Sequence, residues 1–96
     1  MNETTITRHD APDGGEYRAA VTGSTATGRL TYKRRGTVLT ADHTLVPPEI
    51  GGKGVAARLV EALVTGARDD GETIVPQCSY VEAAFRRHPD WGDLRA

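Results

Sequence analysis

The change of pattern at Pro47-Pro48 constrains the fold of this chain more than any other feature. Before this pair, apolar and polar residues alternate in short segments rich in strand-forming residues, which is typical of half-buried β-strands. After it, from Gly54 to about Asp70, apolar residues recur with the helical period. Because proline has no N–H to donate to a sheet, the strand that precedes this pair must end there. The sequence therefore predicts several strands followed by a helix.

Four segments before the prolines are predicted to be strands, separated by three turns. The strands cover residues 4–9, 17–22, 29–33 and 38–46. Each intervening stretch contains glycine, which supplies the positive φ that tight turns need; these stretches are residues 10–15, 22–25 and 34–36. Because the turns are short, we expect neighbouring strands to pair antiparallel.

The fourth strand places Leu39, Ala41, His43 and Leu45 on one face by simple alternation. We therefore expect His43 to face the interior and Asp42 to face solvent. Two roles stay open for His43 at this point: a hydrogen-bonded structural histidine, or a base in a catalytic site.

A second strand–helix unit follows the prolines. The apolar arc of the helix at 54–70 covers about half of its circumference, so the helix should pack on more than one side. A short buried strand at 73–75 and a second helix at 81–88 come next. The passage from residue 38 to residue 75 is long enough for a right-handed parallel crossover. The expected fold is α/β (α+β): a mixed, mainly antiparallel sheet with one β-α-β parallel crossover, in a single domain covering residues 1–96.

Composition excludes several classes of protein. The 96 residues include 12 basic and 13 acidic side chains and one cysteine, so no internal disulfide can form. The net charge of −1 gives no general attraction to nucleic acid or to anionic lipid. The first residues lack the basic start and apolar run of a signal peptide, and no stretch is long and apolar enough for a membrane helix. No His and Cys spacing fits a metal site. We expect a cytoplasmic protein, a monomer or weak dimer, with no metal, nucleic acid or membrane partner.

The loop between the fourth strand and the helix carries the clearest chemical pattern. It contains three glycines in four positions, in the run Gly51-Gly52-Lys53-Gly54. Backbone N–H groups of such a loop, together with those of the first helical turn, can converge on a phosphate. The spacing matches neither the Walker motif nor the dinucleotide fingerprint. Two interpretations stay open from the residues alone: a diphosphate cradle, or a flexible strand–helix turn.

Three runs of the sequence together resemble a known family. Residues 43–62, 76–81 and 86–89 are similar to the minimal, single-domain branch of the GCN5-related N-acetyltransferases. That superfamily binds acetyl-CoA through a motif written [Q/R]-x-x-G-x-[G/A], and Gly54 and Ala56 match its last two fixed positions. Gly51 stands where Gln or Arg is expected, so a side chain that helps to shape the loop is missing.

The resemblance implies how acetyl-CoA lies on the chain. Two parallel strands splay apart, and the pantetheine arm pairs with the backbone of the longer strand, which corresponds to Thr44, Leu45 and Val46. The diphosphate then lies on Gly51, Gly52, Lys53, Gly54, Val55 and Ala56. The Val46 N–H is the nearest donor for the oxyanion that forms during acyl transfer.

The single cysteine follows the short buried strand. The minimal branch carries a cysteine at this place, so the resemblance puts Cys78 near the thioester, where it can accept the acetyl group and pass it to an amine. Such a thiol needs a base or a helix N-terminus nearby, and His43 is the candidate base. Cys78 can also be a small buried apolar residue, or can line the site while an amine attacks directly.

The sequence thus predicts an acetyl-CoA-dependent N-acetyltransferase that acts on a primary amine, either a small molecule or a protein lysine. The alternative, favoured by Gly51, is a module that binds CoA or acyl-CoA without useful turnover. A nucleic-acid-binding domain is a third hypothesis, and its steeply salt-dependent binding is not expected here.

Overall fold

The computed structural model describes residues 3–52 and 54–96 and contains the predicted mixed sheet. Five strands lie in the order β1-β2-β3-β4-β5. The strands are β1 Thr4–Ala11, β2 Gly14–Val21, β3 Thr27–Arg35, β4 Val38–Leu45 and β5 Thr73–Val75. The first four pair antiparallel with their neighbours, whereas β4 and β5 are parallel and are joined through helix α1, Val55–Asp70. The predicted fold class is confirmed.

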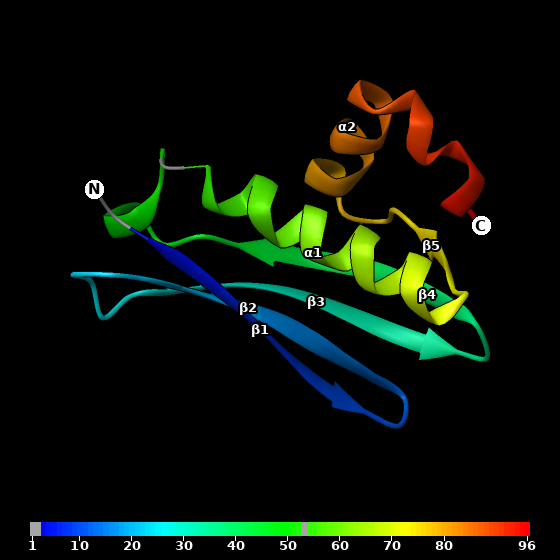
Figure 1. Cartoon of the computed structure of the whole chain (residues 1–96), viewed down its shortest axis with the longest axis horizontal. Coiled ribbons are helices and arrows are strands. Elements are labelled where there is room, and N and C mark those ends of the chain that lie inside the picture. Colours follow the sequence, from blue (N-terminus) through cyan, green and yellow to red (C-terminus); the bar gives the residue numbers. More distant parts are fainter. Residues whose placement is uncertain (1–2, 53) are drawn as a thin grey trace.

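The helices lie together on one side of the sheet (Figure 1). Helix α1 packs across the sheet, and its buried residues Leu59, Leu63 and Ala67 have no exposed surface. Helix α2, Ser79–Arg87, and the 3₁₀ helix η2, Pro89–Leu94, follow β5 and complete this layer. Side chains on the opposite face of the sheet are mostly exposed or half-buried. One face of the sheet is therefore left uncovered. Among the described residues no helix is long and apolar enough to cross a membrane.

Two glycines predicted to lie in the first turn belong to a strand instead. Gly14 and Gly15 begin β2, and the turn is confined to Pro12 and Asp13. A Cβ on Gly14 would lie 2.5 Å from the carbonyl oxygen of Tyr32, and one on Gly15 would lie 2.5 Å from that of His9. Glycine is needed here because the backbones approach closely. The hairpin is thus longer than the sequence predicts.

A β-bulge interrupts the alternation of β4. Thr31 of β3 pairs with His43, but the next residue, Tyr32, pairs with Ala41, so Asp42 is an extra residue. After a one-residue insertion every later side chain changes face. His43 is accordingly exposed, and so is Leu45, at 50%. The prediction that His43 faces the interior is wrong, and Thr44 faces inward in its place.

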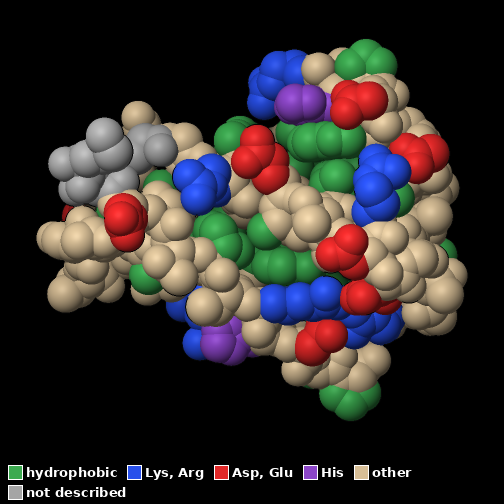
Figure 2. Space-filling model, viewed as in Figure 1, with side chains coloured by type: hydrophobic (Ala, Val, Ile, Leu, Met, Phe, Trp, Pro, Cys, Tyr) green, Lys and Arg blue, Asp and Glu red, His purple; other side chains and the backbone are tan. Residues whose placement is uncertain are grey.

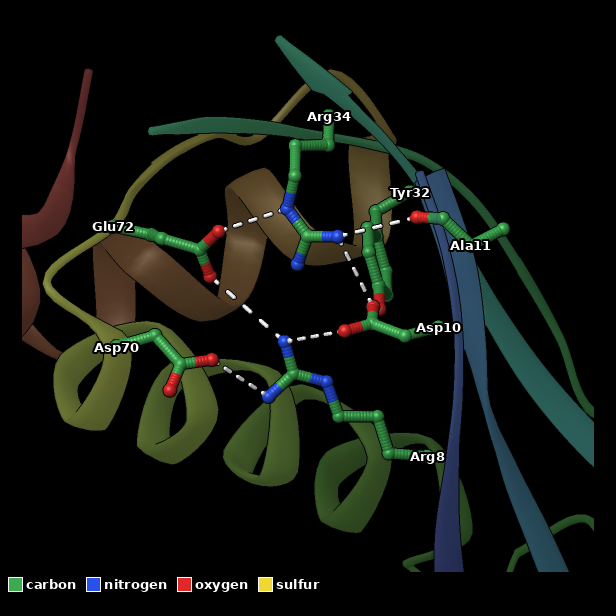
Figure 3. Close-up of polar contacts among 7 residues, drawn as sticks. All are labelled: Arg8, Asp10, Ala11, Tyr32, Arg34, Asp70 and Glu72. Carbon is green, nitrogen blue, oxygen red and sulfur yellow. Dashed lines mark hydrogen bonds and ion pairs between the residues drawn. The ribbon is translucent and has the colours of Figure 1, made fainter. Parts of the chain in front are cut away.

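An ionic cluster of Arg8, Asp10, Arg34, Asp70 and Glu72 ties the sheet to α1 (Figure 3). Arg34 Nε lies 2.9 Å from Glu72 Oε2, and Arg8 Nη1 lies 3.0 Å from Asp70 Oδ2. Glu72 is only 8% exposed, and the two arginines supply its counter-charge. The cluster lies at the C-terminal end of α1, so it fixes the helix at the end opposite to its glycine-rich start.

Candidate coenzyme A site

The connection from β4 to α1 is held by backbone hydrogen bonds and by one buried side chain. The 3₁₀ turn η1, Pro48–Ile50, places the side chain of Ile50 in the core with no exposed surface. The N–H groups of Ile50 and Gly51 donate to the carbonyl oxygens of Pro47 and Pro48, both at 3.1 Å. This anchor fixes the position from which the glycine-rich segment leaves the protein surface.

Gly52 and Gly54 have backbone conformations that favour glycine. Both have φ of +73°, and a Cβ on either would meet nothing within 4 Å. The loop therefore has open space above two glycines in the left-handed region. Lys53, predicted to contact the diphosphate, lies outside the described residues. Gly51 is extended, with φ −69° and ψ 159°, so any residue could stand there.

The start of α1 offers free backbone donors. The first intrahelical bond runs from the Arg58 N–H to the carbonyl oxygen of Gly54, at 3.1 Å. The N–H groups of the three residues before Arg58 precede that ladder, and no side-chain cap from the described residues bonds to them. The side chain of Val55 is buried, so only its backbone N–H is available for binding. A helix start with uncapped N–H groups binds anions well, and its residues fit a diphosphate.

The parallel pairing of β4 with β5 stops partway along β4, and we call the unpaired β4 edge beyond it the gap. Their pairing begins at Val38 with Thr73 and ends at Thr40 with Val75. The Cys78 N–H then donates to the Ala41 carbonyl oxygen at 2.8 Å. Beyond that bond, β4 continues for four more residues, and the described residues pair with it from the β3 side alone. Strand backbone groups at this edge are open to a ligand amide.

Cys78 lies where this gap begins and caps helix α2. It is half-buried, with its Sγ 3.6 Å from the hydroxyl oxygen of Thr44. Burial raises the pKa of the thiol, but hydrogen bonds from the Thr44 hydroxyl and from the N–H groups of Val81, Tyr80 and Thr44 outweigh it and leave the pKa lower than that of an ordinary cysteine. The position thus favours a thiolate.

The structure joins Cys78 to Thr44 and not to His43. In a strand, successive side chains point to opposite faces, so the inward Thr44 and the exposed His43 lie on different sides of the sheet. The sequence predicts Thr44 as a backbone contact only and misses its hydroxyl as the partner of the thiol. The bulge at Asp42 places it there, and no motif in the sequence marks that bulge.

Two comparisons with known proteins bear on this geometry. Residues 16–94 match the family described as GCN5-related N-acetyl-transferase. The chain belongs to this family. Acetyl transfer is the general activity that the family supports.

A solved structure agrees on the fold. The solution structure of a GCN5-like protein from Staphylococcus aureus superposes with a TM-score of 0.69, at 23% sequence identity, over 94% of this chain and 87% of that one. At this identity the likeness concerns the fold alone. It shows that the mixed sheet and its helical layer are those of a GCN5-related protein.

Proposed function

We propose that this GCN5-related protein transfers the acetyl group of acetyl-CoA to a primary amine. The observation that carries the proposal is the unpaired edge of β4, which runs from the level of Cys78 toward the loop that leads to the start of α1. Acetyl-CoA has the matching layout, with a diphosphate, an amide-bearing arm and a thioester in that order. When bound, it supplies an activated acetyl group.

Different residues of the chain bind different parts of acetyl-CoA. The N–H groups of Gly52, Gly54 and Ala56 face the diphosphate, and the edge of β4 from Thr44 to Val46 offers backbone partners to the arm. The Val46 N–H is the proposed oxyanion donor. Leu45 is the largest exposed apolar side chain among the described residues, and it offers contact to the arm or to the acceptor.

A covalent route uses Cys78 as the nucleophile. The Cys78 thiolate forms a bond to the acetyl carbonyl carbon, the bond from that carbon to the sulfur of CoA breaks, and CoA leaves as a thiolate. A neutral amine then attacks the acetyl-cysteine, the amide forms, and the Cys78 thiolate is released. The lowered pKa of this thiol makes it both available as a thiolate and a good leaving group.

His43 is better placed to act as a base on the amine than as a base on the Cys78 thiol. Its side chain is exposed on the uncovered face of the sheet, whereas Cys78 contacts the inward Thr44. An imidazole there can accept the proton of an amine that approaches the thioester from this face. Amine acceptors are thus expected to approach from the uncovered face.

The second candidate is a CoA-binding module without useful turnover. Gly51, where the family motif has Gln or Arg, favours it, because a side chain that helps to shape the loop is missing. Both candidates require CoA binding, and only an enzyme consumes acetyl-CoA when an amine is added.

The test combines calorimetry with CoA, thiol release from acetyl-CoA with a panel of primary amines, and mass spectrometry of the intact chain. We expect heat on CoA binding, amine-dependent thiol release and a transient gain of one acetyl group at Cys78. Cys78→Ala and Cys78→Ser should abolish the adduct. If both variants keep full turnover, the covalent route is wrong and direct attack remains; if wild type binds CoA but releases no thiol with any amine, the module hypothesis replaces the enzyme.

A further inference from the structure

The uncovered face of the sheet contains a pocket of ≈ 650 Å³ beside the gap. Its walls include Lys33 and Arg35 of β3, Val38 and Thr40 of β4, and Gln77, which follows β5. A volume of this size lies in the range of small-molecule sites, about 300–1,000 Å³. Nothing in the binding of CoA described above uses these residues.

The charge of the pocket is positive. Lys33 is 79% exposed and lies 3.9 Å from Asp42, and Arg35 is exposed with no ion pair to the described residues. Arg34 also lines the pocket, but its guanidinium is already paired with Glu72 and Asp10. Among the described residues of the lining, Asp13 is the single carboxylate. The available charges therefore favour an anion, which Arg35 can bind with two donors and Lys33 as a point charge.

Two residues of the pocket wall precede residues that join β4 to Cys78. Gln77 immediately precedes Cys78, and Thr40 immediately precedes Ala41, the residue to which the Cys78 N–H is bonded. The exposed His43 lies further along β4 on the same uncovered face. His43 pairs with Thr31 of β3, so the three steps along β3 from Arg34, midway between Lys33 and Arg35, to Thr31 span about 10 Å at about 3.3 Å per residue.

We propose that this pocket binds the anionic end of the acceptor, so that the preferred substrate is a small molecule with a primary amine about 10 Å from a carboxylate. The inference rests on the proposed function, because it places the amine beside His43 and the gap. The carboxylate lies between Arg35 and Lys33, the linking chain lies over Thr40 and Val38, and the amine end reaches the level of His43.

The first experiment measures binding without acetyl-CoA, so its outcome does not depend on catalysis. The ¹⁵N-labelled chain is titrated with ω-aminooctanoate and, as a matched ligand without the carboxylate, with octylamine. We expect shifts of the backbone amides of Lys33, Arg35, Thr40 and Gln77 with the amino acid and weaker, dispersed shifts with octylamine. Arg35→Gln should weaken this binding about tenfold. Arg68→Gln removes an equal charge from an exposed ion pair of α1 and should leave binding unchanged.

The second experiment measures acetylation of the same two amines. We expect a lower KM for ω-aminooctanoate than for octylamine, and a rise of about tenfold in that KM with Arg35→Gln at nearly constant kcat. Equal binding and equal KM for the two amines would overturn the pocket assignment while leaving the transferase intact. Binding that follows Arg35, combined with no acetylation of either amine, would overturn the proposed function and the acceptor role while leaving an anion pocket.

Discussion

Gly51 and Gly52 are neighbours that should respond to the same substitution in opposite ways. Gly51 is extended, and a Cβ there would lie 3.5 Å from the nearest atom, the Pro48 carbonyl oxygen, which is ordinary contact. Gly52 has φ of +73°, in the left-handed region that side chains disfavour. Gly51→Ala and Gly52→Ala are therefore matched variants that differ in backbone strain and not in chemistry.

The expected difference in the free energy of unfolding follows from these conformations. Gly51→Ala should stabilise the fold by about 0.4–1 kcal/mol, because alanine loses less chain entropy on folding. Gly52→Ala should cost about 1–2 kcal/mol, the strain of a left-handed alanine. A gap of about 2 kcal/mol between the variants corresponds to about 8–16 °C in Tm for a domain of this size. Urea unfolding and thermal melting measure it directly.

The same positions test the diphosphate cradle. Gly51→Gln restores the residue type of the family motif at a position where a side chain fits, and its amide can donate to the diphosphate. One such bond to a charged group is worth about 1.5 kcal/mol, so CoA should bind about tenfold more tightly than to Gly51→Ala. Gly52→Ala should weaken CoA binding, because its Cβ enters the cradle and strains the loop.

Calorimetry of CoA binding to the three variants decides the matter, with Gly51→Ala as the control for backbone effects. Two results would contradict this account of the loop: Gly51→Gln that binds CoA no better than Gly51→Ala, or Gly52→Ala that is as stable and binds CoA as tightly as the wild type. The first result would show that a side chain at position 51 does not contact CoA. The second would show that the loop does not adopt the conformation described.

Three further predictions follow from other contacts. Thr44→Val removes the hydroxyl bonded to Cys78, so the pKa of the thiol should rise and the pH midpoint of iodoacetamide labelling should move upward; an unchanged midpoint would contradict the contact. A Cβ on Gly66 would collide with the buried hydroxyl of Tyr17, which has no hydrogen-bond partner among the described residues. Gly66→Ala should therefore destabilise the wild type by about 1–2 kcal/mol yet stabilise Tyr17→Phe by about 0.5–1 kcal/mol in urea unfolding. Equal effects in the two backgrounds would exclude that packing. The hydroxyl of Tyr32 and the guanidinium of Arg34 hold the pKa of Asp10 below its usual range. The ionised Asp10 therefore stabilises the fold above about pH 4, and this stabilisation is lost as the pH falls through the pKa of Asp10 in the folded state. Asp10→Asn should therefore differ from the wild type in unfolding free energy at pH 7 and converge with it in acid, and a constant difference would refute this.

The sequence predicts the layout of the sheet well because the governing rules are local. Short glycine turns force antiparallel neighbours, and the length between β4 and β5 requires a crossover. Helix α1 and strand β5 lie within one residue of their predicted bounds. Helix α2 begins at Ser79 rather than Val81, because Cys78 rather than a later residue is its cap. The 3₁₀ helix η2 has no periodic pattern of its own and is not predicted; it is held by packing of Trp91 on His88 and Phe85.

In the candidate site, too, features set by local sequence are predicted and features set by distant contacts are not. The cradle is predicted because glycines between a strand and a helix have a direct backbone consequence, although Lys53 lies outside the described residues. The placement of acidic and basic side chains is less predictable. On the face shown in Figure 2, basic and acidic side chains lie next to one another. The nearly balanced number of charges in the sequence therefore predicts neither the ionic cluster nor the positive pocket on the other side of the sheet. Those arise only when strands distant in sequence meet.

The bulge at Asp42 shows why alternation alone misplaces the chemistry. Without the extra residue, His43 would face the helical layer beside Cys78, and Thr44 would face solvent. With it, the thiol receives a hydroxyl partner and a helix N-terminus, which favour a thiolate without a histidine. His43 is released to the uncovered face, on the side of the Arg35 pocket. The two residues predicted to act together, Cys78 and His43, are thus separated by a single inserted residue in β4.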